Sequence, residues 1–222
     1  QNVGMQDVTP PTDAVLVGGG VMSATVGALL KELEPGWSIE VFERLQDVAL
    51  ESSHVLNNAG TGHAALCELN YTPERPDGSV DVSKALKINE LFEVSRQFWA
   101  YLQRQGHFAA PREFITAVPH ISFVRGDEDV AFLKKRCEAL CGHPLFEGMQ
   151  YSQDRGEMAE WMPLVMAGRD PAERVAATRT THGTDVNFGA LTRGLFRAMA
   201  RAGGVRVHLQ HEVRGLERLP DG

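Results

Sequence analysis

The spacing of hydrophobic and polar positions predicts a β-α-β unit near the start of the chain. Residues 14–17 (AVLV) form a short apolar run that stops at three glycines, which is typical of a buried parallel strand. Apolar residues then recur with helical spacing over 21–33, on a face that includes Leu29, until Gly36 ends the helix. Residues 38–43 alternate between apolar and polar, which predicts a second strand.

The remaining chain combines one long irregular segment with further helices and strands. Residues 44–80 are rich in Ser, Asn, Gly, Thr and Pro and are predicted to be loop, apart from a brief helix at 64–69. We expect Thr184 and Asp185 to cap the helix that follows them, and the Lys134–Arg136 run to form a solvated face. Helices are expected at 84–106, 127–140, 152–161 and 187–202, and extended segments at 114–124, 175–181, 205–209 and 213–219.

Composition places the chain among ordinary globular proteins. It has 222 residues, of which 43% are hydrophobic and 23% charged, so we expect one large domain or slightly more. The net charge of −7 argues against general nucleic-acid binding, which needs a dense basic face. The odd number of cysteines, three, suits a reducing compartment, and no apolar window is long enough for a transmembrane helix. A cytoplasmic location is therefore expected, and no metal site is predicted because Cys137 and Cys141 alone supply too few ligands.

A glycine fingerprint joins the first strand to the first helix. Gly18 would allow a tight turn, Gly20 would let the backbone approach phosphates, and the small Ser23 would permit close packing of helix on strand. The helix N-terminus offers free N–H groups to a pyrophosphate. Glu43 ends the second strand, where a carboxylate can accept hydrogen bonds from ribose hydroxyls. The pattern predicts dinucleotide binding, the alternative being a Gly-rich turn without a ligand, and by itself it does not separate FAD from NAD.

The loop after Glu43 favours a flavin over a nicotinamide. A plain NAD domain continues promptly into a helix and a third strand, whereas here a long polar segment intervenes. Residues 57–63 (NNAGTGH) combine small side chains with two amides and a histidine, so the segment can pass close to a flat ring and hydrogen-bond its polar edge. An NAD-dependent dehydrogenase is accordingly disfavoured.

At these residues the sequence resembles the malate:quinone oxidoreductase family, within the flavoproteins related to D-amino-acid oxidase. The resemblance implies an α/β fold: a Rossmann-like three-layer FAD/NAD(P)-binding domain with an inserted α+β substrate domain, truncated at the C-terminus. It assigns 13–106 and 175–222 to the FAD-binding domain and 107–174 to the substrate domain. The matching stretches are GGGVMSATVGALLKELEP, IEVFERL, NNAGTGHAALCELNYTPE, DVSKALKINELFEVSRQFWAYL and HGTDVNFGALTRGLF.

The resemblance also implies an activity and a cofactor, FAD. Such an enzyme oxidises L-malate to oxaloacetate in the tricarboxylic acid cycle and passes the electrons to a quinone, attached peripherally to the inner face of the cell membrane. The segment 53–56 departs from the family pattern, in which a Pro and a Trp precede the double Asn. The cofactor-binding residues implied are Gly18, Gly20 and Ser23 for the pyrophosphate, Glu43 for the ribose, Asn58, Ala59, Gly60, Thr61, Gly62 and His63 along the flavin, and the backbone of Val213 at the adenine.

Three residues are candidates for the chemistry on malate. A base must accept the hydroxyl proton, which suits a histidine such as His63 or His182, and a guanidinium such as that of Arg179 suits a carboxylate. Each could instead be a hydrogen-bonded loop residue or a surface cation. Two other functions stay open: a related FAD-dependent amino-acid or hydroxy-acid oxidase or dehydrogenase, and a truncated fragment without activity.

Overall fold

The computed structural model describes residues 12–108 and 110–218. These residues form two compact units. Unit 1 comprises the described residues of 1–59, 103–114 and 187–222, and unit 2 comprises 60–102 and 115–186. The contacts thus group 60–102 with 115–186, whereas the sequence analysis grouped 60–102 with the FAD-binding domain. Which unit binds which ligand stays a prediction.

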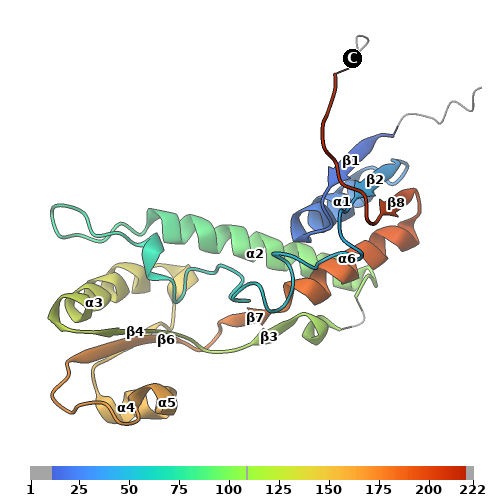
Figure 1. The fold of residues 1–222 in the computed structure, drawn as a ribbon. Helices are drawn as coiled ribbons and strands as arrows, with labels where there is room; N and C mark the ends of the chain where they lie inside the picture. The colour runs from blue at the N-terminus through green and yellow to red at the C-terminus, as the bar shows by residue number, and fades with distance from the viewer. Residues whose placement is uncertain (1–11, 109, 219–222) are drawn as a thin grey trace, which may run out of the picture. The chain divides into compact units, whose positions relative to one another are not determined.

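Unit 1 contains a three-stranded parallel sheet in the order β1-β2-β8 (Figure 1). The strands are β1 (Ala14–Val17), β2 (Ile39–Phe42) and β8 (Val205–His208). Helix α1 (Val21–Leu33) connects β1 to β2, and helix α6 (Phe188–Ala202) precedes β8. Parallel neighbours need such helical crossovers, so the predicted α/β class and its β-α-β unit are confirmed.

Helices α1 and α6 pack together beside the sheet. Gly27 makes this approach possible, because a Cβ there would lie 2.5 Å from Met199 Sδ and 3.0 Å from Leu16 Cδ1. The buried stripe of α1 includes Ala24 and Ala28, while Leu29 is 43% exposed. Leu29 was expected to share one apolar face with Ala24 and Ala28, but it is exposed while they are buried, because the face of α1 that meets α6 is centred on smaller residues.

Unit 2 is built on antiparallel sheets. β6 (Val175–Thr180) lies between β4 (His120–Arg125) and β5 (Gln150–Ser152), and β3 (Ile115–Ala117) pairs with β7 (Thr184–Val186). The remaining helical elements of the chain are α2 (Ser83–Arg104), α3 (Asp127–Cys141), α4 (Arg155–Trp161), α5 (Pro163–Met166), and the short 3-10 turns η1 (Leu69–Tyr71), η2 (Pro111–Glu113) and η3 (Pro144–Phe146).

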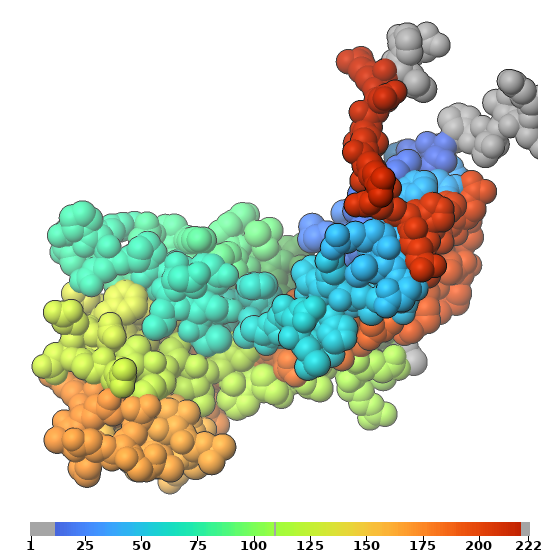
Figure 2. Space-filling model, viewed as in Figure 1, coloured from blue at the N-terminus to red at the C-terminus, as the bar shows by residue number. Residues whose placement is uncertain are grey.

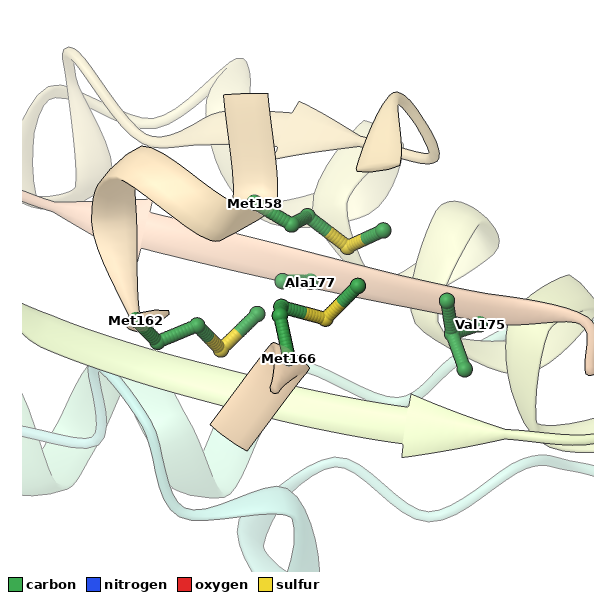
Figure 3. Close-up of a cluster of buried hydrophobic side chains, with 5 residues drawn as sticks. All are labelled: Met158, Met162, Met166, Val175 and Ala177. Atoms are coloured by element: carbon green, nitrogen blue, oxygen red, sulfur yellow. The ribbon is translucent and has the colours of Figure 1, made fainter. Parts of the chain in front are cut away.

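The strand β6 has a different cover on each face. On one face, methionines of α4, of α5 and of the residue between them pack over Val175 and Ala177, as Figure 3 shows. On the other face, Val130 and Leu133 of α3 pack against Ala176. The outer side of the α4–α5 pair lies at the surface (orange in Figure 2), where Leu164 is 93% exposed. The methionines of the cluster are Met158, Met162 and Met166.

Several local predictions were wrong, and each error has a physical reason. Residues 64–69 are not a helix, because side chains from other elements hold the carbonyls that a helix would use. Thr184 and Asp185 belong to β7, and the cap of α6 is Asn187, whose side chain accepts from Ala190 N at 2.9 Å. No strand follows β8 among the described residues 213–218, and residue 219 of that prediction lies outside the described part.

Two further expectations need correction. The helix expected at 152–161 is present as α4 and ends at Trp161 as expected, but it begins at Arg155, because Ser152 ends β5 and Asp154 caps α4. Arg136 does not lie on a solvated face, because it is fully buried at 0% exposure beneath the segment that follows the Asn-Asn loop.

Candidate functional site

The turn between β1 and α1 has the conformation that the glycine fingerprint predicts. Gly18 adopts φ +94°, a left-handed conformation that side chains disfavour, although open space surrounds its Cα. Its N–H donates to Phe42 O at 2.8 Å, which fastens the turn to the end of β2. Gly20 is the N-cap of α1 and supplies no side-chain cap. The Val21 N–H donates instead to Ser53 Oγ at 2.9 Å. The packing role predicted for Ser23 agrees with its hydroxyl, which donates to Val17 O at 3.4 Å.

Glu43 closes the site from the end of β2. Its side chain is buried, at 8% exposure. One carboxylate oxygen accepts from Gly19 N at 2.5 Å, and the other accepts from Leu45 N at 2.8 Å. A carboxylate offers about four acceptor positions, so about two remain for a ligand. Glu43 therefore stabilises the turn between β1 and α1 through these two hydrogen bonds. The ribose contact expected of Glu43 stays a prediction.

These residues surround a cavity of about 260 Å³ within unit 1. The first turn of α1 contributes its N–H groups and the positive end of the helix dipole, which together attract phosphate. Ser53, which the sequence reasoning left without a role, is 4% exposed and lies in the wall. No local pattern marks Ser53, because its contact with α1 spans 32 positions. The lining residues are 17–23, Glu43 and 49–53.

The predicted flavin loop divides between the two units. In unit 1, the Asn58 side chain donates to Ser52 O at 3.0 Å and to His54 O at 2.9 Å, which closes the preceding turn. Ala59 is exposed. The Asn58 amide is therefore partly committed to loop structure.

In unit 2, the loop continues in left-handed conformations. Gly60 and Gly62 have φ +67° and +70°, and a Cβ on Gly62 would lie 2.3 Å from the Phe92 ring of α2. The Thr61 hydroxyl donates to Glu68 Oε1 at 3.0 Å. His63, also left-handed at φ +57°, is exposed, with its Nδ1 3.4 Å from Tyr71 Oη.

The three candidate catalytic residues all belong to unit 2 but are not joined there. Arg179 lies on β6 with its guanidinium carbon 5.5 Å from the centre of the Trp161 ring. Its Nε is buried and has no hydrogen-bond partner among the described residues. His182 is exposed, between β6 and β7. Among the described residues no hydrogen bond or ring contact links any two of His63, Arg179 and His182, so their shared role stays a prediction.

Val213, the last of the predicted cofactor-binding residues, is half-buried in a segment without regular structure. Burial, followed by the charge of Glu68, raises the pKa of the Cys67 thiol to about 11. Burial also raises the pKa of Cys137 to about 12, with Cys141 Sγ 3.1 Å away. Within the described residues no group of three or more potential ligands could hold a metal ion.

Solved structures similar to the chain show its fold. It is similar over 89% of its length to glycine oxidase from Geobacillus kaustophilus, with a TM-score of 0.65 and 20% identity. Over 95% it is similar to L-α-glycerophosphate oxidase from Mycoplasma pneumoniae, solved with FAD bound, with a TM-score of 0.64 and 15% identity. The chain covers 46% and 47% of those two chains. The likeness shows the fold, which is the α/β architecture of these oxidoreductases.

The family follows from sequence comparison. The model of the malate:quinone oxidoreductase (Mqo) family matches residues 10–222. A probable malate:quinone oxidoreductase of Geobacillus sp. (strain WCH70) is 58% identical over 95% of the chain, and probable malate:quinone oxidoreductase 1 of Pseudomonas aeruginosa is 56% identical over 95%. The chain belongs to the malate:quinone oxidoreductase family. It spans 41% and 40% of the length of these two relatives. None of the helices within the described residues has the length and hydrophobicity to cross a membrane.

Proposed function

We propose that this chain supplies the FAD-binding part of an enzyme that oxidises L-malate to oxaloacetate and passes the electrons to a quinone. The observation that carries the proposal is the 260 Å³ cavity at the start of α1, in a chain that belongs to this family. The cavity joins a helix N-terminus to a buried carboxylate, which are the groups that bind a pyrophosphate and a ribose.

The residues of the cavity fit the ADP half of FAD. The left-handed Gly18 and the side-chain-free Gly20 leave the N–H groups of Met22 and Ser23 in the first turn of α1 for phosphate oxygens, while the Val21 N–H donates to Ser53 Oγ. Glu43 keeps acceptor positions for ribose hydroxyls while its present bonds hold the turn. We assign the flavin ring to the loop Asn58–His63 and the adenine to the backbone of Val213, as the family resemblance implies.

When bound, FAD accepts the two electrons that malate oxidation releases. The protein must then remove the hydroxyl proton and bind the substrate carboxylates. We assign proton acceptance to a neutral imidazole nitrogen of His182 or His63, because histidine titrates near neutral pH. We assign carboxylate binding to Arg179, whose buried Nε lacks a partner and whose guanidinium lies beside Trp161.

The electron acceptor decides where the enzyme works. Quinones of respiratory chains dissolve in the membrane, so electron transfer to them requires close approach to the bilayer. We propose peripheral attachment at the cytoplasmic face of the membrane, with the reaction placed in the tricarboxylic acid cycle.

An anaerobic reduction experiment tests this function. The FAD-loaded chain is mixed with L-malate, and the loss of absorbance near 450 nm is followed; we expect bleaching. His182→Ala and His63→Ala should identify the base, since the correct variant slows bleaching while FAD stays bound. His143→Ala, a histidine outside the predicted site, is the control. Bound FAD that malate does not reduce, but that an amino acid or another hydroxy acid does, would replace the substrate assignment with that of a related oxidase.

A further inference from the structure

Two thiol groups lie against each other at the end of α3 in unit 2. Cys137 and Cys141 are four positions apart, so their side chains lie one turn apart on the same face of the helix. Their Sγ atoms are 3.1 Å apart. The Cys141 thiol donates to Met149 O at 3.5 Å, and since a thiol carries one hydrogen, the Cys137 thiol is left to donate to Cys141 Sγ. The two sulfurs therefore already face each other.

Solvent reaches this pair of thiols from the side of Cys141. Cys141 is exposed and is the last residue of α3, and helix ends fray readily. Cys137 is buried at 7% exposure, and burial raises the pKa of its thiol to about 12. A thiol reagent therefore meets Cys141 first, and Cys137 reacts with a group that Cys141 already holds.

The helical spacing of the two cysteines favours a bridge of one atom over a direct disulfide. Side chains four positions apart on a helix have Cβ atoms about 5–6 Å apart. A disulfide brings its Cβ atoms to about 3.5–4.5 Å, so it would have to deform the end of α3. An atom bonded to both sulfurs lengthens the link between the two Cβ atoms and needs no such deformation.

The identity of the bridging atom follows from the number and direction of its bonds. A structural zinc ion takes four ligands, and within the described part of the chain no group of three or more potential metal ligands is found. A linear two-coordinate ion holds its two sulfurs on opposite sides, which would push Cys137 and Cys141 apart. Trivalent arsenic forms pyramidal bonds, so it holds two sulfurs side by side, and as a soft centre it prefers thiolates.

We propose that Cys137 and Cys141 form a dithiol site that binds trivalent arsenic compounds. With an arsonous acid, both S–H bonds and both As–OH bonds break, two As–S bonds form, and each thiol proton leaves with a hydroxyl group as water. Arsenic stays trivalent, so no oxidant or reductant takes part. The third thiol, Cys67, contacts Glu68 and His120 and would supply a single bond. The site uses none of the residues assigned to FAD or malate, so it does not depend on the proposed function.

Phenylarsine oxide, which carries one trivalent arsenic atom, tests the site on the folded chain. We expect the intact mass to show one phenylarsine group per chain. Alkylation of the unfolded adduct, followed by peptide mapping, should modify Cys67 and leave Cys137 and Cys141 unmodified. Excess glutathione, a monothiol, should leave the adduct in place, whereas dithiothreitol, a dithiol, should remove it. Circular dichroism should show unchanged helix content, because one atom spans the pair.

Removal of either thiol should leave arsenic with a single bond to the chain. Cys141→Ser changes an exposed position, and Cys137→Ala keeps a small apolar side chain in the buried position. Each variant should bind phenylarsine oxide about a hundredfold or more weaker, because the second bond forms within one molecule. Cys67→Ser is the matched control and should bind as tightly as the unchanged chain.

Three results would overturn the proposal. The first is equal affinity of Cys141→Ser and the unchanged chain for phenylarsine oxide. The second is an adduct that glutathione removes as readily as dithiothreitol does, since a monothiol exchanges readily with a single As–S bond. The third is an adduct located at Cys67. Should Cys137→Ala not fold, Cys141→Ser decides the question by itself, because its side chain lies at the surface.

Discussion

Replacing Glu43 should loosen the turn that begins the candidate cofactor site. In Glu43→Ala, the Gly19 and Leu45 N–H groups lose their acceptors. An unsatisfied buried N–H costs about 1–3 kcal/mol. Gly19 is buried and should show the full cost, whereas the half-buried Leu45 can recover part of it from water. We therefore expect a loss of about 2–4 kcal/mol in the free energy of unfolding. Glu43→Gln keeps one carbonyl acceptor and should lose about 1–3 kcal/mol.

The assay should report on unit 1 alone, because two compact units need not unfold together. Trp37 belongs to unit 1, and the other two tryptophans, Trp99 and Trp161, belong to unit 2. Urea unfolding is therefore followed by Trp37 fluorescence in a Trp99→Phe, Trp161→Phe background. Glu34→Ala, at an exposed position of the same unit, is the matched control and should change stability by less than about 0.5 kcal/mol. If Glu43→Ala unfolds at the same urea concentration as Glu34→Ala, the reasoning is refuted.

Four further predictions concern other parts of the chain. Hydrogen bonds from Arg206, and to a lesser extent from His208, lower the pKa of Glu40 below its ordinary value of 4.5. The stability that these bonds contribute is present above pH 4.5 and is lost as the pH falls through the lowered pKa. Glu40→Gln should therefore make the free energy of unfolding, measured by urea unfolding, less dependent on pH on the acid side. Met158→Ala should cost about 2–5 kcal/mol in chemical unfolding because Met158 is fully buried, while the exposed Leu164→Ala should be nearly neutral. Gly62→Ala should destabilise unit 2 more than Gly168→Ala, since both have φ +70° but only Gly62 faces a ring, and equal midpoints in thermal unfolding would contradict this. In a thiol-reagent titration at pH 8, the exposed Cys141 should react before Cys67, whose pKa is raised to about 11.

The first half of unit 1 could be predicted from sequence because its signals are local. The strand at 14–17, the glycine turn and the helix at 21–33 each follow from residues close in the chain, and the structure has the same bounds. The left-handed φ of Gly18 follows in the same way from the tight turn.

The residues that the sequence analysis missed act through contacts distant in the chain. Ser53 reaches α1 across 32 positions, and Arg136 reaches Ala65 across 71. A signal for Arg136 was present, since it lies three positions after Leu133 and four before Leu140, both on the buried stripe of α3. The neighbouring lysines obscured it, because a run of three basic residues usually faces solvent.

The helix wrongly predicted at 64–69 has the same origin. Its composition permits a helix, but Asn89 and Arg136 take the carbonyls of Ala64 and Ala65 that helical hydrogen bonds would need. Tertiary contacts of this kind override local propensity, and a single sequence does not reveal them.

Titration of the purified chain with FAD tests the central claim most directly. FAD fluorescence and the absorbance band near 450 nm are followed for the unchanged chain and for Gly20→Val. Gly20 has an ordinary extended backbone, and a Cβ there would meet nothing closer than Ser53 Oγ at 3.4 Å, so the variant should fold. Valine is a poorer N-cap than glycine, so the urea midpoint is measured beside the Kd to show that the variant is folded during the titration. The account predicts one FAD per chain in the unchanged protein and binding at least tenfold weaker in Gly20→Val. No FAD binding by the unchanged chain, or equal binding by the two, would contradict it.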